Sequence, residues 1–123
     1  MEEKVTIQWL KEPEEHDYPA AQSYLSLIFK KSEAEKYVRK LRKARLTKFP
    51  AKDVFRASGL SLLGISNLRV KNDQEKIRSG KALSPLLLVR DSANGRVIIA
   101  DGYHRMCAVY SFYEDAVINC KIV

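Results

Sequence analysis

The sequence predicts an α+β fold in which helices come first and a small mixed sheet with one helix follows. Two observations lead to this prediction. Apolar residues recur at helical spacing through much of residues 17–80, and after Gly80 the pattern changes to short runs of Val, Ile and Leu separated by turn residues. The length of 123 residues fits one domain. Within this domain, residues 1–69 are expected to form a helical lead-in and residues 70–123 a β-β-α-β core.

The lead-in is expected to hold an extended segment followed by a pair of helices. Residues 4–10, "KVTIQWL", mix β-branched residues with a tryptophan, which predicts a short strand or an extended stretch. "DYPAAQSYLSLIFKK" has apolar residues at helical spacing, and Asp17 is expected to be its N-cap. Ser32 and Glu35 form a capping-box pattern, which predicts the start of a second helix that pairs with the first as a hairpin.

Two further helices and a small sheet are expected after this hairpin. "PAKDVFRASGL" predicts a short helix that ends at Gly59, "LSLLGISNL" is ambiguous, and "VKNDQEKIRSGK" predicts a polar helix that ends at Gly80. "PLLLVRD" and "VIIAD" then predict two strands joined by a turn at Asn94-Gly95. A helix over about residues 103–113 and a terminal strand, "AVINCKIV", complete the order.

The net charge of the chain is +7, and it is concentrated in residues 30–56, where eleven basic residues stand against three acidic ones. A basic surface of this kind attracts polyanions. The sequence therefore predicts a nucleic-acid contact on the second helix, made by Arg39, Lys40, Arg42 and Lys43. The alternative is a solvated helix face that only keeps the protein soluble.

Several classes of protein are not expected from this composition. No apolar run approaches the roughly 20 residues that a membrane span needs. The N-terminus is acidic and lacks the layout of a secretory signal, so a cytoplasmic location without a membrane partner is expected. Cys107 and Cys120 are expected to be buried free thiols. No CxxC, HExxH or His/Cys cluster occurs, so no metal site is expected.

The segment "ADGYHR" places polar residues where a predicted strand feeds a predicted helix. The first amides of a helix lack intrahelical partners and carry partial positive charge, and Gly102 would let an anion approach them. Arg105 is a candidate for bidentate contact and His104 for a donor or proton shuttle. Asp101 is a candidate to cap the helix, to orient His104 or to hold a divalent metal. The alternative is an ordinary turn with an exposed His and Arg.

The segment from Ile77 to Val123 resembles the ParB/sulfiredoxin-like superfamily, whose members share a basic helix, a hairpin, a glycine-led helix and a final short strand. Gly102-Tyr103-His104-Arg105 is similar to the Gly-Cys-His-Arg of sulfiredoxins and the Gly-Glu-Arg-Arg of ParB-type domains. Since Tyr103 stands where sulfiredoxins carry their cysteine, reduction of a sulfinic acid is not expected. The Arg-Arg pair of the ParB motif is not complete here, which counts against ParB-type nucleotide switching.

The resemblance implies a module that binds the phosphate of a nucleotide or nucleic acid at the helix N-terminus, with ATP or CTP and Mg²⁺ as the implied cofactors. The residues implied in phosphate contact are Gly102, Tyr103, His104, Arg105, Ser84 and Lys81. Weak nuclease or NTPase activity stays open, with His104 and Asp101 as its candidate catalytic residues. A non-catalytic interaction or regulatory module that uses the basic hairpin, with the DGYHR junction purely structural, is the alternative.

Overall fold

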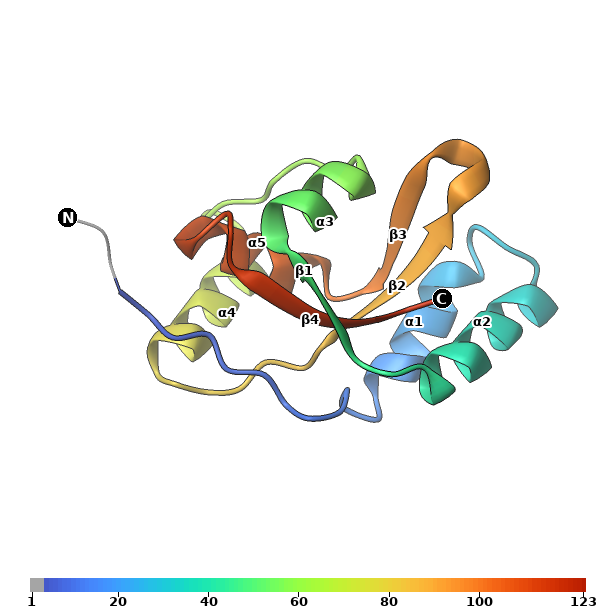
Figure 1. Ribbon diagram of the computed structural model, residues 1–123, viewed down its shortest axis with the longest axis horizontal. Helices are drawn as coiled ribbons and strands as arrows, with labels where there is room; N and C mark the ends of the chain where they lie inside the picture. The colour runs from blue at the N-terminus through green and yellow to red at the C-terminus, as the bar shows by residue number, and fades with distance from the viewer. Residues whose placement is uncertain (1–3) are drawn as a thin grey trace.

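A four-stranded mixed sheet forms the centre of the protein in a computed structural model, which describes residues 4–123 (Figure 1). The strand order is β1-β4-β2-β3, and the four strands are β1 (Thr47–Pro50), β2 (Leu86–Asp91), β3 (Arg96–Asp101) and β4 (Val117–Ile122). β2 and β3 form an antiparallel hairpin, β4 lies parallel to β2, and β1 lies antiparallel to β4. A parallel neighbour requires a crossover connection, which here contains helix α5 (Tyr103–Phe112).

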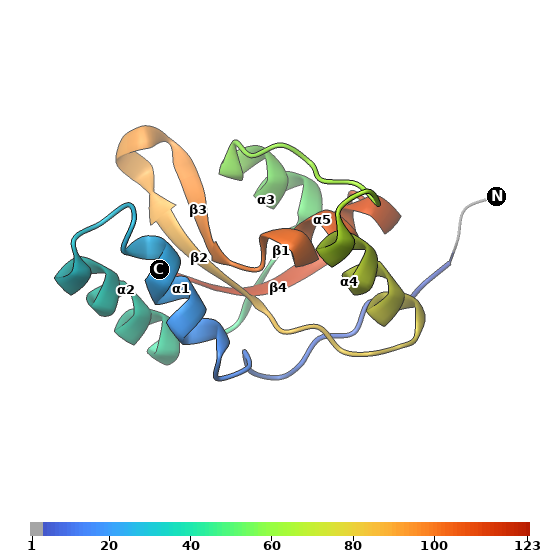
Figure 2. The same cartoon turned by 180° about the vertical axis from the view of Figure 1, so that it is seen from behind.

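Helices cover both faces of this sheet. Helices α3 (Ala51–Ser58), α4 (Leu68–Arg78) and α5 lie on one side, and α1 (Asp17–Leu25) and α2 (Lys31–Lys43) lie on the other (Figure 2). Alternation along β2 supplies both cores: Leu86 and Leu88 pack with α3, α4 and α5, whereas Leu87 and Val89 pack with α1 and α2. The α+β class predicted from the sequence is therefore confirmed.

The helical hairpin of α1 and α2 is present, but its caps differ from the prediction. His16 is the N-cap residue of α1, and Asp17 is its first helical residue, with a side chain that is buried. The capping-box prediction is wrong, because α2 begins at Lys31 and Ser32 lies inside its first turn. Lys30 is already extended, and its carbonyl accepts from the amides of Glu33 and Ala34. No side chain within residues 4–123 caps this helix.

Strand β1 is a departure from the predicted helical lead-in. Its four residues are too few to show an alternating pattern, and their backbone partners lie in β4, with Thr47 opposite Cys120. The extended N-terminal segment also joins the later part of the chain, through a parallel bridge between Trp9 and Leu83. The lead-in thus contributes β1 to the same sheet as the strands of the β-β-α-β core, and residue 69 is not a boundary between two separately folded parts.

The remaining elements follow the predicted order. Helix α3 ends at Gly59, which takes a left-handed conformation with φ 67°. The ambiguous stretch after Gly59 is an irregular loop that leads to Asn67, the N-cap of α4. Cys107 and Cys120 are both buried free thiols within the described chain, and burial raises the pKa of Cys120 to about 11. None of the helices in residues 4–123 is long and apolar enough to cross a membrane.

Candidate functional site

The junction between β3 and α5 forms one wall of a cleft. β3 ends at Asp101, Gly102 turns the chain with φ 109°, and α5 begins at Tyr103. No side chain of residues 4–123 caps this helix, whose first helical hydrogen bond runs from the Met106 amide to the Gly102 carbonyl at 2.9 Å. The first-turn amides are therefore available to an external acceptor, as an unsatisfied helix N-terminus requires.

Helix α4 supplies the opposite wall of this cleft, which has a volume of about 240 Å³. The cleft is lined by Asp101, Gly102, His104 and Arg105 from the junction and by Arg69, Asn72, Asp73 and Lys76 from α4. Asn67 sets the start of α4, since its Oδ1 accepts from the amides of Arg69 and Val70 at 3.0 and 3.2 Å. Asn72, Asp73 and Lys76 lie three, four and seven residues after Arg69, so the four residues share one helix face.

Sequence reasoning missed the α4 wall. A signal was present, because Arg69, Asp73 and Lys76 recur at helical spacing on one polar stripe of "LRVKNDQEK". That stripe by itself is indistinguishable from a solvated helix face. Only the packing of α4 beside α5 turns it toward the glycine-led helix (Figure 2).

Charges in the cleft are mixed, with cations in excess. Arg69, Lys76 and Arg105 stand against Asp73 and Asp101. Burial raises the pKa of the Asp73 carboxyl, although the nearby cations, Lys76 foremost at 3.8 Å, oppose this. The cleft is therefore a polar surface whose one excess cation is balanced by Asp17 behind Arg105.

The His104 imidazole lies among the charges of Arg69, Asp73 and Arg105. Burial lowers its pKa, and the positive charge of Arg69 lowers it further, although Asp73 acts in the opposite direction. The imidazole is therefore mostly neutral at neutral pH, with one nitrogen as donor and the other as acceptor.

Arg105 is held by two carboxylates at the floor of the cleft. Its Nη2 lies 3.0 Å from Oδ2 of Asp101 and 3.5 Å from Oδ2 of Asp17, which is only 3% exposed. Burial raises the pKa of the Asp101 carboxyl, the charge of Arg105 lowers it, and the neighbouring Asp17 raises it. Arg105 thus joins α5 to the start of α1, and a phosphate would meet a guanidinium that is already paired. Its Nε is a buried donor without a partner among residues 4–123.

Ser84 and Lys81 lie apart from the described lining of the cleft. The Ser84 hydroxyl is buried, donates to Oδ2 of Asp17 and accepts from the Glu14 amide at 3.0 Å. Ser84 therefore fixes Asp17 behind the site rather than facing the cleft. Lys81 is exposed in the loop after α4, with its amide bonded to the Lys76 carbonyl.

Gly102 and Tyr103, the two remaining residues of the motif, stabilise the structure around the junction. A Cβ on Gly102 would lie 2.6 Å from Cγ of Leu86 and 3.0 Å from Nη2 of Arg105, so packing and the left-handed φ both require glycine. The Tyr103 hydroxyl donates to the Ser61 carbonyl and so ties the loop before α4 to α5. The Tyr103 ring lies 5.4 Å from the His104 ring, between centroids. The tyrosine is therefore near the cleft without being one of its lining residues.

The basic patch of α2 lies on the other side of the sheet from the cleft. Arg39 and Arg42 line a groove of about 580 Å³ between α1 and α2, whereas Lys40 and Lys43 are exposed. Arg42 is paired with Glu15 and lies 4.3 Å above the Tyr18 ring. The two predicted anion surfaces are therefore separate.

A magnesium ion does not fit the donor set of the cleft. Its two lining carboxylates both face cations, since Asp101 binds Arg105 and Asp73 lies beside Lys76. Mg²⁺ prefers oxygen ligands in a near-ideal octahedron. No group of three or more His, Cys, Asp or Glu side chains within residues 4–123 is placed to hold a metal.

Comparisons of the chain with protein-family models, curated proteins and solved structures find no match.

Proposed function

We propose that this chain is a phosphate-binding module of the ParB/sulfiredoxin-like kind, and that the cleft between α4 and α5 takes the phosphate of a nucleotide. The observation that carries the proposal is the uncapped N-terminus of α5 opening onto a cleft with Arg69 and Lys76 on its far wall. Helix amides and cationic side chains that converge on one point are a recurring way to hold a phosphate.

The residues divide between binding and support. The first-turn amides of α5, His104 and the side chains of Arg69 and Lys76 contact the phosphate. Arg105 is a positioning residue, because Asp101 and Asp17 already hold its guanidinium. A cleft of about 240 Å³ is smaller than the roughly 300–1,000 Å³ of typical small-molecule sites, so it encloses phosphates and leaves the base outside.

Binding without turnover is the function we propose. Hydrolysis needs a base placed on water and stabilisation of the leaving oxygen. His104 is one candidate base, but the carboxylate of Asp101 is occupied by Arg105 at 3.0 Å. More residues of the cleft are placed to bind a phosphate than to assist its hydrolysis, so the proposal is limited to binding.

Substitutions on α4 test the cleft directly. Arg69→Gln is expected to weaken the binding of CTP, ATP or inorganic phosphate by about tenfold or more, because a charge-assisted hydrogen bond contributes roughly 1.5–3 kcal/mol. Lys76→Gln is expected to act in the same direction. The measurement is isothermal titration calorimetry, supported by the rise in melting temperature that ligand binding causes.

Lys71→Gln is the matched control, since it removes one exposed charge from the same helix at a position outside the described lining. Its affinity is expected to stay within about twofold of the unmodified protein, as for a surface charge outside the site. If none of the three ligands binds at millimolar concentration, or if Lys71→Gln weakens binding as much as Arg69→Gln, the proposal is wrong.

The pH dependence of anion binding supplies a second test. Since the pKa of His104 is lowered in the free protein, an anion in the cleft is expected to raise it, because a negative charge favours the imidazolium. By linkage, sulfate is then bound more tightly as pH falls through the His104 midpoint, and this gain is lost as pH rises again. The measurement is an NMR titration of the two histidines with and without sulfate.

Variants of the protein identify which NMR signal belongs to His104 and which charge lowers its pKa. His16→Gln leaves His104 as the single histidine of the chain. Arg69→Gln is expected to raise the His104 midpoint, since it removes a charge that lowers it, whereas Lys71→Gln leaves the midpoint in place. A His104 midpoint that sulfate does not move would contradict its place in the site.

A further inference from the structure

Part of the second sheet face is not covered by α1 and α2. On β4, alternation turns Val117, Asn119 and Lys121 to the side opposite the α3–α4–α5 core. Lys121 lies beneath α1 and is 3% exposed, with Nζ 3.0 Å from the Tyr18 hydroxyl, whereas Val117 is 46% exposed. Lys48 of β1 is paired with Asn119 and points to the same open side. Helix α1 therefore covers this face of β4 at Lys121, whereas the face is open at Val117.

A groove of about 440 Å³ lies over this open part. One wall is the extended N-terminal segment, whose alternation places Val5, Ile7 and Trp9 on one side, where they are partly buried against the α3–α4–α5 core and also line the groove. The rest of the groove is lined by Lys48, Tyr113, Ala116, Val117 and Asn119. The Tyr113 hydroxyl accepts from the Val5 amide at 2.9 Å, which ties the segment to the end of α5. The groove thus holds two aromatic rings, one cation and one amide side chain.

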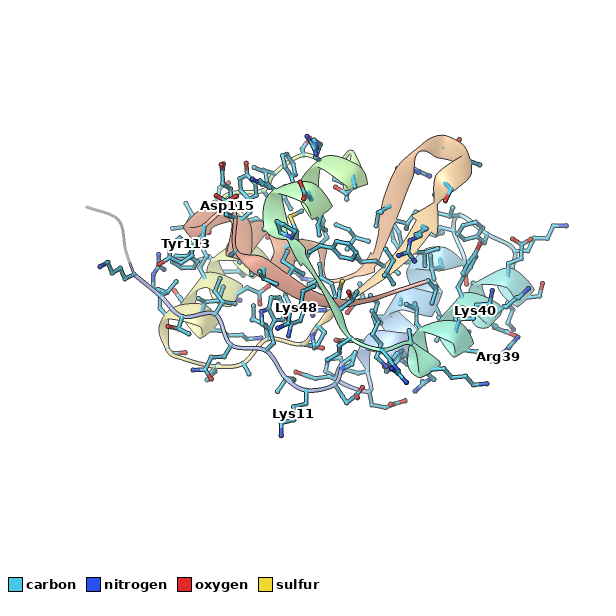
Figure 3. All side chains as sticks on the ribbon, viewed as in Figure 1. Lys11, Arg39, Lys40, Lys48, Tyr113 and Asp115 are labelled. Atoms are coloured by element: carbon cyan, nitrogen blue, oxygen red, sulfur yellow. The ribbon has the colours of Figure 1, made fainter. Side chains whose placement is uncertain are left out.

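Basic side chains continue from this groove onto α2. Lys43, the last residue of α2, and Arg45, in the loop that joins α2 to β1, are exposed and precede Lys48 in the chain. Lys11, Lys48, Arg39 and Lys40 are distributed over the face shown in Figure 3, with Tyr113 on the same face.

Acidic side chains near this face are largely compensated by cations. Glu12 lies 3.4 Å from Lys121, Glu15 pairs with Arg42, and Asp115 pairs with Lys52 at 2.6 Å. No ion pair within residues 4–123 engages Lys48, Lys43 or Arg45. The uncompensated charge of the face is therefore positive.

We propose that this open sheet face binds single-stranded nucleic acid, with Trp9 and Tyr113 as stacking surfaces and Lys48, Lys43 and Arg45 as phosphate contacts. Aromatic side chains in a positive groove suit unpaired bases, because every base offers a flat face and every linkage a negative charge. The bases of a duplex are stacked inside it and do not reach the rings. No residue that lines this groove also lines the α4–α5 cleft, so the inference does not depend on the proposed nucleotide site.

Trp9 is the single tryptophan of the chain, so its fluorescence reports directly on this groove. An oligothymidylate of about fifteen nucleotides is expected to quench it saturably, with an affinity that falls as salt rises. A duplex of the same length is expected to cause little quenching. Lys48→Gln is expected to raise the Kd about threefold or more, and Lys43→Gln with Arg45→Gln to reduce the salt dependence by about one to two phosphate contacts.

A stacking variant and two matched controls complete the experiment. Trp9→Leu is expected to weaken binding, followed by fluorescence anisotropy of a labelled oligonucleotide, about fivefold or more, while Trp9→Phe retains most of the affinity. Lys71→Gln removes one charge from α4 and is expected to leave the Kd unchanged. If Trp9→Leu does not fold, the Trp9 quenching and the Lys48→Gln comparison still decide the question.

Two results would overturn the inference. One is the absence of Trp9 quenching by the oligothymidylate. The other is binding that Arg69→Gln abolishes and Lys48→Gln leaves intact, which would place the strand in the α4–α5 cleft. Failure of the nucleotide site has a different signature, since Arg69→Gln would then change neither nucleotide nor oligonucleotide binding while Trp9 is still quenched.

Discussion

Arg105→Met is expected to destabilise the folded protein by about 3 kcal/mol, because breaking a buried ion pair leaves an uncompensated charge behind. The guanidinium stands between Asp101 and Asp17, and the side chain of Asp17 is almost completely enclosed. Methionine keeps much of the length of the arginine stem, so the loss is electrostatic more than steric. In thermal unfolding, the melting temperature is expected to fall by about 10 °C.

Two comparisons isolate the cause of this loss. Asp17→Asn combined with Arg105→Met is expected to cost less than the sum of the single changes, since the orphaned charge is removed with its partner. The cost of Arg105→Met is also expected to shrink as pH falls, because the Asp101 carboxyl, whose pKa burial raises, takes up a proton and no longer needs a cation.

Arg96→Met is the control for loss of an arginine from an ion pair. Arg96 pairs with Asp91 at 2.8 Å in the exposed hairpin, and its loss is expected to cost much less stability than the loss of Arg105, because solvent screens an exposed pair. If Arg105→Met costs no more than Arg96→Met, the guanidinium does not support the fold as described. Such a result would return Arg105 to the role of a direct phosphate ligand.

Gly102→Ala is expected to cost about 3 kcal/mol through two additive effects. The left-handed φ of 109° is unfavourable for any residue with a side chain, at roughly 1–2 kcal/mol. The new Cβ would also lie 2.6 Å from Cγ of Leu86, which is fully buried, and overpacking of this kind costs roughly 1–3 kcal/mol. Denaturant unfolding followed by circular dichroism measures the loss.

Gly59→Ala separates backbone strain from packing. Gly59 has a φ of 67°, and no described heavy atom lies within 4 Å of the Cβ position, so only the strain of about 1 kcal/mol is expected. In Gly102→Ala combined with Leu86→Ala, the total loss is expected to fall short of the sum, because the small residue at position 86 makes room for the Cβ. Equal losses for Gly59→Ala and Gly102→Ala would contradict the packing argument.

The candidate site was only partly predictable from the sequence. The pattern of a strand ending in Asp101-Gly102 before a helix is local, so it indicated the junction and its free amides directly. The roles of Ser84 and Asp17 could not be predicted from local sequence patterns. Ser84 was expected among the phosphate contacts and Asp17 at a helix cap, yet the two side chains bond to each other behind Arg105 across a separation of 67 residues.

Local patterns in the sequence by themselves determined the α+β class, the helical hairpin, the β2–β3 turn and the burial of both cysteines, since helical spacing, alternation and turn residues act over a few neighbours. Only the tertiary structure decided that residues 47–50 form a strand, that α4 faces the N-terminus of α5, and that Arg105 is shared by two carboxylates. These features depend on partners far apart in the chain, whose pairing is stabilised by burial and hydrogen bonding after the fold has closed.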